Sequence, residues 1–440
     1  MSARTFFCPA LKKPSPLKRW RLLILSGLLL LPFETSAQQA VTTLAGSVFI
    51  TGSVDGPATN ALFNDPAGLA IDANGNIYVA DSQNHTLRKL SAGGIVTTLA
   101  GKAGQFGSAN GTGTNASFNT PSGIALGGDS TLYVTDTGNH TIRRVTTNGV
   151  VSTLAGFAGQ SGITNATGSL ARFNTPLGIA VDQSGILYVA DSGNHTIRKV
   201  TSAGVVTKLA GSAEVWGSTD GTGGAALFNG PVGIAIDSKQ NIYVSDSNNQ
   251  TIRKVTTAGV VTTWAGQAGV DGATDGIGSA ALFSKPAELK IDRNDNLFVL
   301  DSFNHTIRRI TTNAVVTTLA GLPGNGGATD GFAGAARFFN PYGLAIDRNG
   351  NLRVSDTYNQ TIRFVYQPIT ASLVRDGGNL IISWQAAAGN KYQVQSKQET
   401  DGAAWQNLGA IVTATNSVGT QADNLPPALG QRFYRVMLLP

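Results

Sequence analysis

Copies of the stretch Tyr188-Val-Ala-Asp-Ser-Gly-Asn-His-Thr-Ile-Arg198 recur along the whole middle of the chain. Its aspartate recurs every 55 residues without a gap, at Asp81, Asp136, Asp191, Asp246, Asp301 and Asp356. Self-similarity at a fixed period is typical of repeat proteins, in which each unit buries its apolar faces against its neighbours. The chain therefore contains six copies of one structural unit.

Each repeat holds four short runs rich in Ile, Val, Tyr, Leu and Thr, separated by turn residues such as those at 72–76 and 91–94. These are strand and hairpin signals. Runs such as Gly178-Ile-Ala-Val181 are apolar on both faces, which a sheet requires only when both faces are covered. Four-stranded sheets packed around an axis meet this condition, so we predict an all-β six-bladed β-propeller. A β-sandwich is the competing arrangement, but six ungapped copies are hard to divide between two sheets.

The two ends of the repeat region complement each other. The sixth repeat ends at Thr361–Val365 and lacks the Val-Val-Thr-Thr-Leu-Ala-Gly strand that ends the other five, while an isolated copy stands at Val41–Gly46. We expect this N-terminal strand to supply the missing outer strand of the sixth blade. Such closure removes an exposed sheet edge.

The string Tyr-Val-x-Asp-Ser/Thr-x-Asn-His-Thr-Ile-Arg resembles the NHL repeat, named after an Asn-His-Leu triplet. The resemblance covers residues 41–367, although repeats four and six carry Asn249-Gln250 and Asn359-Gln360 instead of Asn-His. It implies a propeller that serves as an interaction module. Some six-bladed propellers of this kind are instead metal-dependent lyases or lactonases.

Residues outside the repeats suggest two further segments. Basic residues from Lys12 to Arg21 precede the apolar run Leu22–Phe33 and a small-residue site ending at Ala37, so we expect residues 1–37 to be a secretory signal peptide. The propeller then occupies residues 38–367. Alternating runs at 380–384, 392–396 and 432–436, together with Trp405, predict a small β-sandwich-like domain over residues 368–440. That pattern resembles fibronectin type III modules appended to secreted bacterial proteins.

Removal of the signal peptide would change the net charge and the cysteine content of the chain. The chain has 32 basic and 26 acidic side chains, and residues 1–37 hold six of the former and one of the latter, which leaves a nearly neutral remainder. No basic stripe remains for nucleic acid, and the sole cysteine, Cys8, leaves with the signal. We expect a monomer in the periplasm or outside a bacterial cell, without a membrane span, metal or other cofactor.

The polar residues that recur in every repeat are expected to serve the fold. All four histidines, His85, His140, His195 and His305, share one repeat position, which favours a turn or strand-start role over a metal site. Each repeat aspartate is a diagonal neighbour of an arginine seven residues later, as in Asp81 and Arg88, which favours a structural ion pair over a catalytic carboxylate.

Two recurring features leave alternatives open. The Arg-Lys and Arg-Arg dipeptides, such as Arg88-Lys89, are either a basic ring for an anion or paired strand positions. The long connectors carry Asp-Gly turns, as at Asp275-Gly276, and end in a Phe three residues before a Pro. They are either calcium loops or turns in which the Phe fills the gap between blades.

The candidate binding site lies where the repeats disagree. Five first strands begin with Gly and have Ala two residues on, but the fifth has Glu288 and Lys290. The variable hairpin position holds Gln83, Gly138, Gly193 and Asn248, and then the aromatic residues Phe303 and Tyr358. We expect Glu288, Lys290, Phe303, Tyr358 and Asn248 to share one face of the ring as a ligand site. The alternative is an ion pair between Glu288 and Lys290 beside two exposed aromatic rings.

Three function classes remain. A scaffold that binds a protein, peptide or glycan on one propeller face is favoured, since repeat architectures present composite surfaces. A metal-dependent lyase or lactonase is the alternative, and a structural envelope part is the third. No nucleophile elbow, zinc helix or phosphate loop occurs after residue 37.

Overall fold

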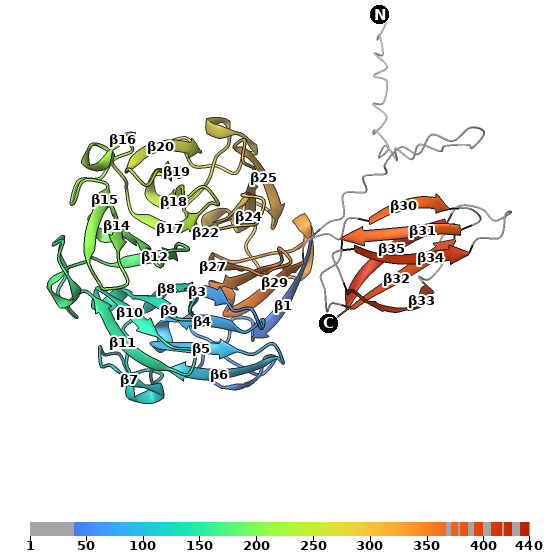
Figure 1. Cartoon of the computed structure of the whole chain (residues 1–440), viewed down its shortest axis with the longest axis horizontal. Coiled ribbons are helices and arrows are strands. Elements are labelled where there is room, and N and C mark those ends of the chain that lie inside the picture. The colour runs from blue at the N-terminus through green and yellow to red at the C-terminus, as the bar shows by residue number, and fades with distance from the viewer. Residues whose placement is uncertain are drawn as a thin grey trace, which may run out of the picture. The chain divides into compact units, whose positions relative to one another are not determined.

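The computed structural model of the chain describes residues 39–366, 371–376, 379–385, 391–398, 406–415, 418–424 and 432–439. Residues 39–366 form six sheets arranged as a ring, which confirms the all-β six-bladed propeller (Figure 1). The predicted signal at residues 1–37 lies outside the described residues, as do Gln367 and Pro368 at the predicted domain boundary. In the part that is described, no helix is long and apolar enough to cross a membrane.

Each blade is built from four antiparallel strands in chain order from the axis outward. The innermost strands are β3 (Pro66–Ile71), β8 (Pro121–Leu126), β12 (Pro176–Val181), β17 (Pro231–Ile236), β22 (Pro286–Ile291) and β27 (Pro341–Ile346). The second strands are β4 (Ile77–Asp81), β9 (Leu132–Asp136), β13 (Leu187–Asp191), β18 (Ile242–Asp246), β23 (Leu297–Asp301) and β28 (Leu352–Asp356). The third strands are β5 (Thr86–Leu90), β10 (Thr141–Val145), β14 (Thr196–Val200), β19 (Thr251–Val255), β24 (Thr306–Ile310) and β29 (Thr361–Tyr366).

The outer edge of the blades differs from the expected four strands. The fourth strands are β6 (Ile95–Ala100), β11 (Val150–Ala155), β15 (Val206–Ala210), β20 (Val260–Ala265), β25 (Val315–Ala320) and, in blade six, β1 (Ala40–Gly46). In every blade except the third, a two-residue strand from the connector adds a fifth: β2 (Gly56–Pro57), β7 (Gly111–Thr112), β16 (Gly221–Thr222), β21 (Gly276–Ile277) and β26 (Gly331–Phe332). The extra pairing partly caps an outer edge that would otherwise be open.

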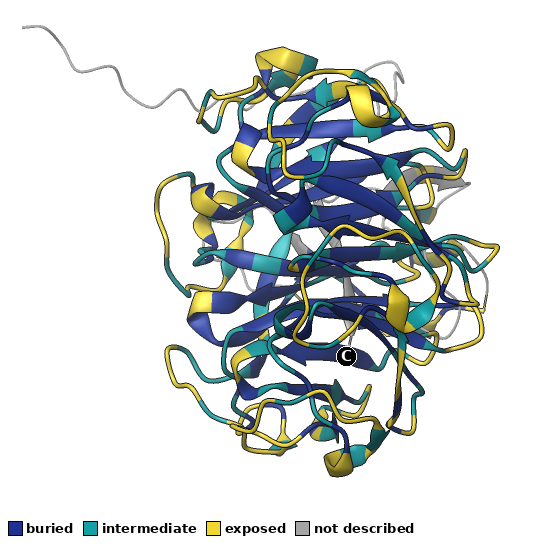
Figure 2. Cartoon of the chain, turned by 90° about the vertical axis from the view of Figure 1, so that its left-hand side faces the viewer, coloured by how far each residue is buried: buried dark blue, intermediate teal, exposed yellow. Residues whose placement is uncertain are grey.

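Apolar side chains fill the space between neighbouring blades. One buried cluster joins Tyr188, Ala190 and Ile197 of blade three to Ile234 and Val244 of blade four. Figure 2 shows the consequence: the strands are buried, and the exposed residues lie in the loops. Both faces of each sheet are covered, which explains the strands without polar alternation.

A buried ion pair between the second and third strands recurs in all six blades. In blade three, Arg198 Nη1 lies 2.7 Å from Asp191 Oδ2, and neither side chain is more than 2% exposed. Asp191 also accepts hydrogen bonds from Asn194 Nδ2 and the backbone N–H of Asn174. Burial raises the pKa of each of the six aspartates to about 6, opposed first by the neighbouring arginine, so each carboxylate is ionised at neutral pH. The predicted structural ion pair is confirmed.

The same arginine ties the connector to the blade. In blade five, Arg308 Nη1 donates to the carbonyl of Leu282, and Nη2 donates to the carbonyl of Thr274 and to Asp275 Oδ1. The guanidinium lies 5.1 Å from the ring centroid of the fully buried Phe283. This confirms the expectation that the connector Phe fills the gap between blades. The connector aspartate is paired with the arginine.

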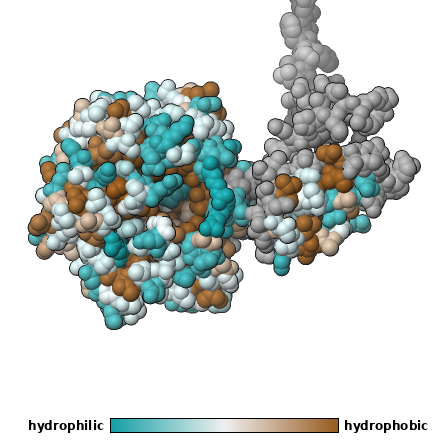
Figure 3. Space-filling view, in the orientation of Figure 1, coloured by the Kyte–Doolittle hydropathy of each residue, from teal (hydrophilic) through white to brown (hydrophobic). Residues whose placement is uncertain are grey.

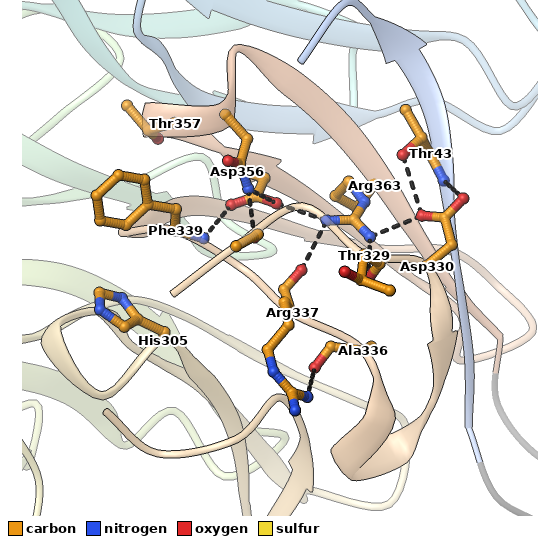
Figure 4. Close-up of polar contacts among 12 residues, drawn as sticks. Thr43, His305, Thr329, Asp330, Ala336, Arg337, Phe339, Asp356, Thr357 and Arg363 are labelled. Carbon is orange, nitrogen blue, oxygen red and sulfur yellow. Dashed lines mark hydrogen bonds and ion pairs between the residues drawn. The ribbon is translucent and has the colours of Figure 1, made fainter. Parts of the chain in front are cut away.

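The N-terminal strand closes the ring, as predicted. Strand β1 pairs antiparallel with β29, with Val41 opposite Val365 and Gly46 opposite Thr361. Figure 4 shows the additional polar tie: Asp330 accepts hydrogen bonds from the backbone N–H and hydroxyl of Thr43 and forms an ion pair with Arg363.

Each of the four histidines links its blade to the next one. Each ends a short helical turn with positive φ, such as η1 (Ser82–Asn84) before His85. His85 Nδ1 accepts the backbone N–H of Thr120 at 3.0 Å, and the other three histidines make the equivalent contact. The structural role expected for the histidines is confirmed.

The C-terminal residues form two three-stranded sheets. One contains β30 (Ala371–Asp376), β31 (Asn379–Gln385) and β34 (Val418–Asn424), and the other contains β33 (Gln406–Thr413), β32 (Lys391–Gln398) and β35 (Arg432–Leu439). Residues of both sheets, including Trp384 and Val394, share one buried apolar cluster. Trp405 lies outside the described residues.

We predict that deleting residues 38–46 lowers the free energy of unfolding by several kcal/mol, since each net ladder hydrogen bond contributes roughly 1 kcal/mol. Urea denaturation of the deletion and of the full chain measures the difference. Thr43→Ala, which removes only one side-chain contact to Asp330, serves as the control and should cost far less. An unchanged unfolding midpoint in the deletion would contradict closure by β1.

A second prediction concerns the buried ion pair. Asp191→Asn leaves the buried guanidinium of Arg198 without its counter-charge, so we expect a loss of about 3–5 kcal/mol in unfolding free energy. The matched control is Asp275→Asn, because blades two and three already place Asn110 and Asn165 at that connector position. The control should cost less than about 1 kcal/mol, since its carboxylate is half exposed. Equal losses in the two variants would show that the inner pair has no special role.

Candidate functional site

A cavity of about 250 Å³ opens between blades four, five and six. It lies on what we call the mouth face, where the second strands end and the first strands begin, as the pairing of Asp301 with Pro286 shows. Its wall consists of Val232, Ser247, Lys285, Ala287, Ser302, Phe303, Asn340, Tyr342, Thr357 and Tyr358. These residues come from the starts of inner strands and from the hairpin turns that follow the second strands.

Two half-exposed aromatic rings stand at the rim of this cavity. Phe303 lies in the turn η9 (Ser302–Asn304) and Tyr358 in the equivalent turn η11 (Thr357–Asn359) of the next blade. A backbone hydrogen bond holds each turn. The Phe303 N–H donates to the carbonyl of Ser284, and the Tyr358 N–H donates to the carbonyl of Phe339. The side chains are nevertheless 55% and 50% exposed. The rings are therefore held in place but left open to a ligand.

Further aromatic groups support Tyr358 from below the rim. The ring of Phe339 lies 5.4 Å from that of Tyr358, and His305 lies 5.5 Å from Phe339, both edge to face. Figure 4 shows Phe339 next to Asp356, which forms an ion pair with Arg363, and shows His305 below Phe339. The other repeats have Asn64, Asn119, Asn174, Asn229 or Ser284 where blade six has Phe339, so this support is not shared.

Lys285 contributes the cavity's charge. Its ammonium donates to Asn248 Oδ1 at 2.7 Å. It is the sole charged side chain in the cavity wall, and no carboxylate in the part of the chain that is described lies within 4.0 Å of it as an ion-pair partner. A cation without a counter-charge beside aromatic rings gives the cavity a positive potential.

Tyr342 closes the cavity toward the axis. Burial raises the pKa of Tyr342 to about 12; the neighbouring Ser122 hydroxyl on blade two opposes this rise, and the Glu288 carboxylate adds to it. The ring also packs on apolar residues between blades one and two. Tyr342 thus reaches past blade one and lies across the mouth end of the central channel.

The opposite end of the channel holds a second cavity of about 240 Å³. Its wall is made from the Ala and branched aliphatic positions of all six inner strands, and hydrophobic residues are visible inside the central hollow in Figure 3. Lys290 is its one charged wall residue and forms an ion pair with the buried Glu288. Burial raises the pKa of Glu288, opposed by the ammonium of Lys290.

The five residues expected to form one site are thus divided. Phe303 and Tyr358 line the mouth cavity, and Asn248 holds its lysine. Lys290 lines the channel cavity, and Glu288 lies between the two cavities in the ion pair that the sequence left open as the alternative.

Sequence reasoning missed Lys285 and Tyr342. The same signal could have found both, since the position before the proline reads Asp65, Thr120, Thr175, Gly230, Lys285 and Asn340, and the position after it reads Ala67, Ser122, Leu177, Val232, Ala287 and Tyr342.

The remaining polar candidates are tied into the fold. The first arginine of each dipeptide is buried in its ion pair, as Arg88 is with Asp81. The second residue packs on an aromatic ring in some blades, as Lys254 does on Tyr243 and Trp264. Within the described ranges, no group of three His, Cys, Asp or Glu side chains is close enough to hold a metal ion.

The chain is similar to known repeat proteins. The family model described as NHL repeat matches residues 63–90, 118–145, 173–200 and 228–255, which lie in blades one to four. Protein SUPPRESSOR OF QUENCHING 1, chloroplastic, of Arabidopsis thaliana is 30% identical over 319 residues, covering 68% of this chain and 30% of that protein. The chain spans only 30% to 40% of the length of the first curated relatives that it matches.

Solved structures show the same fold. A protein of unknown function from Bacteroides thetaiotaomicron has a TM-score of 0.60 and 24% identity, over 74% of this chain and 75% of that one. An auxiliary nutrient binding protein from the same species has a TM-score of 0.57 and 18% identity, over 75% of this chain and 76% of that one. Together with the repeat match, these likenesses show that the chain carries NHL repeats folded into a six-bladed β-propeller.

Proposed function

We propose that the propeller is a binding scaffold that holds a protein, peptide or glycan ligand on its mouth face at blades five and six. The observation that carries the proposal is the cavity with Phe303 and Tyr358 half exposed at its rim. Exposed aromatic rings supply contact area at little entropic cost, because they have only two rotatable side-chain bonds. A concave apolar wall with a few polar groups is the usual form of a ligand site.

The repeat itself provides an internal reference for this proposal. Blades two and three have Gly138 and Gly193 at the position of Phe303 and Tyr358. Their hairpin turns nevertheless have the same helical geometry. The aromatic residues are therefore not needed to build the hairpin turn. The nutrient binding named for the Bacteroides relative agrees with a ligand on such a ring, but at 18% identity that likeness is one of fold, so the cavity carries the argument.

A metal-dependent lyase or lactonase is the second candidate, and the channel supports acid–base chemistry but not the metal, since the described residues include no group of three His, Cys, Asp or Glu side chains that could hold one. Glu288 is a buried carboxyl whose pKa burial raises, next to the ammonium of Lys290 and near the phenol of Tyr342. Perturbed groups of this kind gather at catalytic sites as well as in structural ion pairs. Stoichiometric bound metal together with turnover of a lactone would favour this candidate over the scaffold.

The setting of the scaffold is also a proposal. The basic and apolar character of residues 1–37 supports export and cleavage after Ala37, so we propose that the mature chain acts in the periplasm or outside a bacterial cell, and that it does so as a monomer. The two C-terminal sheets with a shared core support a small sandwich of fibronectin type III type over residues 368–440, separate from the propeller at 38–367.

We predict that Phe303→Gly with Tyr358→Gly weakens binding at least tenfold to whichever peptide or glycan the wild-type protein retains on defined arrays. The free energy of unfolding should change by less than about 1 kcal/mol, because glycine already stands there in two blades. Phe106→Ala, which removes another exposed ring from blade two, is the control. Equal loss of binding from the control would place the ligand elsewhere on the face.

A further prediction separates the channel from the mouth cavity. Glu288→Gly with Lys290→Ala restores the residues of the other five inner strands, so we expect ligand binding to persist and stability to be equal or higher. A folded-state pKa raised above 4.5 means that the folded protein holds this proton more tightly than the unfolded chain does. The wild type should therefore lose stability relative to the double variant as the pH rises above about 4.5, which denaturation at several pH values measures. Loss of ligand binding in the double variant would favour the channel as the functional site.

A further inference from the structure

We infer that the mouth cavity recognises a carboxylate on an apolar body, of the kind found at the C-terminus of a peptide that ends in an apolar or aromatic residue, and that Lys285 is the group that binds the carboxylate. The inference rests on the proposed function and names the chemistry of its ligand.

The charge of the cavity favours an anionic ligand. Lys285 is the one charged residue of the wall, and it has a neutral amide, Asn248 Oδ1, as its hydrogen-bond acceptor instead of a carboxylate. An ammonium has three donors, so contact with Asn248 leaves two for a ligand. The strong complement to a partly desolvated ammonium is an anion. Ser247 and Asn340 add neutral polar groups to the same wall.

Lys285 lacks an inter-blade hydrogen bond that the equivalent residues of the other repeats make. At the other five blade boundaries, the backbone N–H at this position donates to a His Nδ1 or a Gln Oε1 of the preceding blade. Among the described residues, Lys285 makes no such contact, and the buried Gln250 Oε1 that should receive it has no hydrogen-bond partner. A buried acceptor left unpaired costs stability, so this boundary departs from the repeat without a structural gain.

The apolar residues of the wall favour a ligand that is apolar apart from its carboxylate. Phe303, Tyr358, Tyr342, Val232 and Ala287 surround the polar groups, and the volume of about 250 Å³ suits one side chain. A sugar acid would bring several hydroxyl groups against this wall, whose Ser302 and Thr357 hydroxyls already donate to backbone carbonyls, so Ser247 and Asn340 would be left to replace the hydrogen bonds that these hydroxyls lose to water. An aromatic or aliphatic side chain would instead gain contact with two rings. The wall therefore favours a peptide terminus over a glycan.

The test uses two probes that differ only in charge, N-acetylphenylalanine and N-acetylphenylalaninamide, with glucuronic acid as the sugar arm. Isothermal titration of the full chain without its first 37 residues should show the acid binding at least tenfold more tightly than the amide, and glucuronic acid binding more weakly than both. A hydrogen bond to a charged group supports a difference of this size. Equal affinity for acid and amide, tighter binding of glucuronic acid, or no binding of either phenylalanine probe would overturn the inference.

Variants taken from the protein's own repeats distinguish a failure of the carboxylate inference from a failure of the proposed binding site. Lys285→Thr places the residue found at Thr120 and Thr175 in the same positive-φ position, so the fold is preserved while the acid loses its advantage over the amide. Lys239→Ala removes a charge from an exposed turn elsewhere and should change neither affinity. If Phe303→Gly with Tyr358→Gly weakens both probes but Lys285→Thr alters nothing, the carboxylate inference fails and the proposed function stands. If the aromatic variant also leaves both affinities unchanged, the proposed site fails as well.

Discussion

The buried ion pair between a second-strand aspartate and a third-strand arginine is the interaction on which the rest of this structure depends. Its arginine also reaches two connector carbonyls and packs over the connector Phe, so one side chain joins two strands and a loop of more than 20 residues. A guanidinium can do this because its donors form a rigid planar fork. Burial makes each pair costly unless its carboxylate is well hydrogen-bonded, which explains why the Asn and backbone N–H partners recur with it, although the Nε of each of the six arginines is buried without a partner among the described residues.

The blades could be predicted because this interaction requires the same residues at the same spacing six times. The 55-residue period, the Asp-Arg offset and the isolated strand at Val41–Gly46 were sufficient for the six blades, the ion pairs and the closure. The two-residue edge strands were not foreseen, because Gly-Thr or Gly-Ile pairs such as Gly276–Ile277 have no strand signal of their own and pair only through the adjoining outer strand.

The candidate site could be predicted only in part. Disagreement among repeats identified Phe303 and Tyr358, which the structure brings to one cavity. The same reasoning did not separate Glu288 from them, because strand alternation places a residue on a sheet face but not at a depth along the channel. Lys285 and Tyr342 also differ from their counterparts in the other repeats, but the role of Tyr342 comes from its reach past blade one to the apolar residues between blades one and two. Such a contact depends on the closed ring and has no local signature.

We propose that a ring fixed by six equal ion pairs frees blades five and six to carry a ligand site. Hydrogen exchange measured by mass spectrometry, with and without the ligand retained on the arrays, tests it most directly. We expect slower exchange on ligand addition in residues 284–288, 302–304, 339–342 and 357–359, and no change in the equivalent segments of blades two and three. Equal protection in blades two and three, or none in blades five and six, would contradict it.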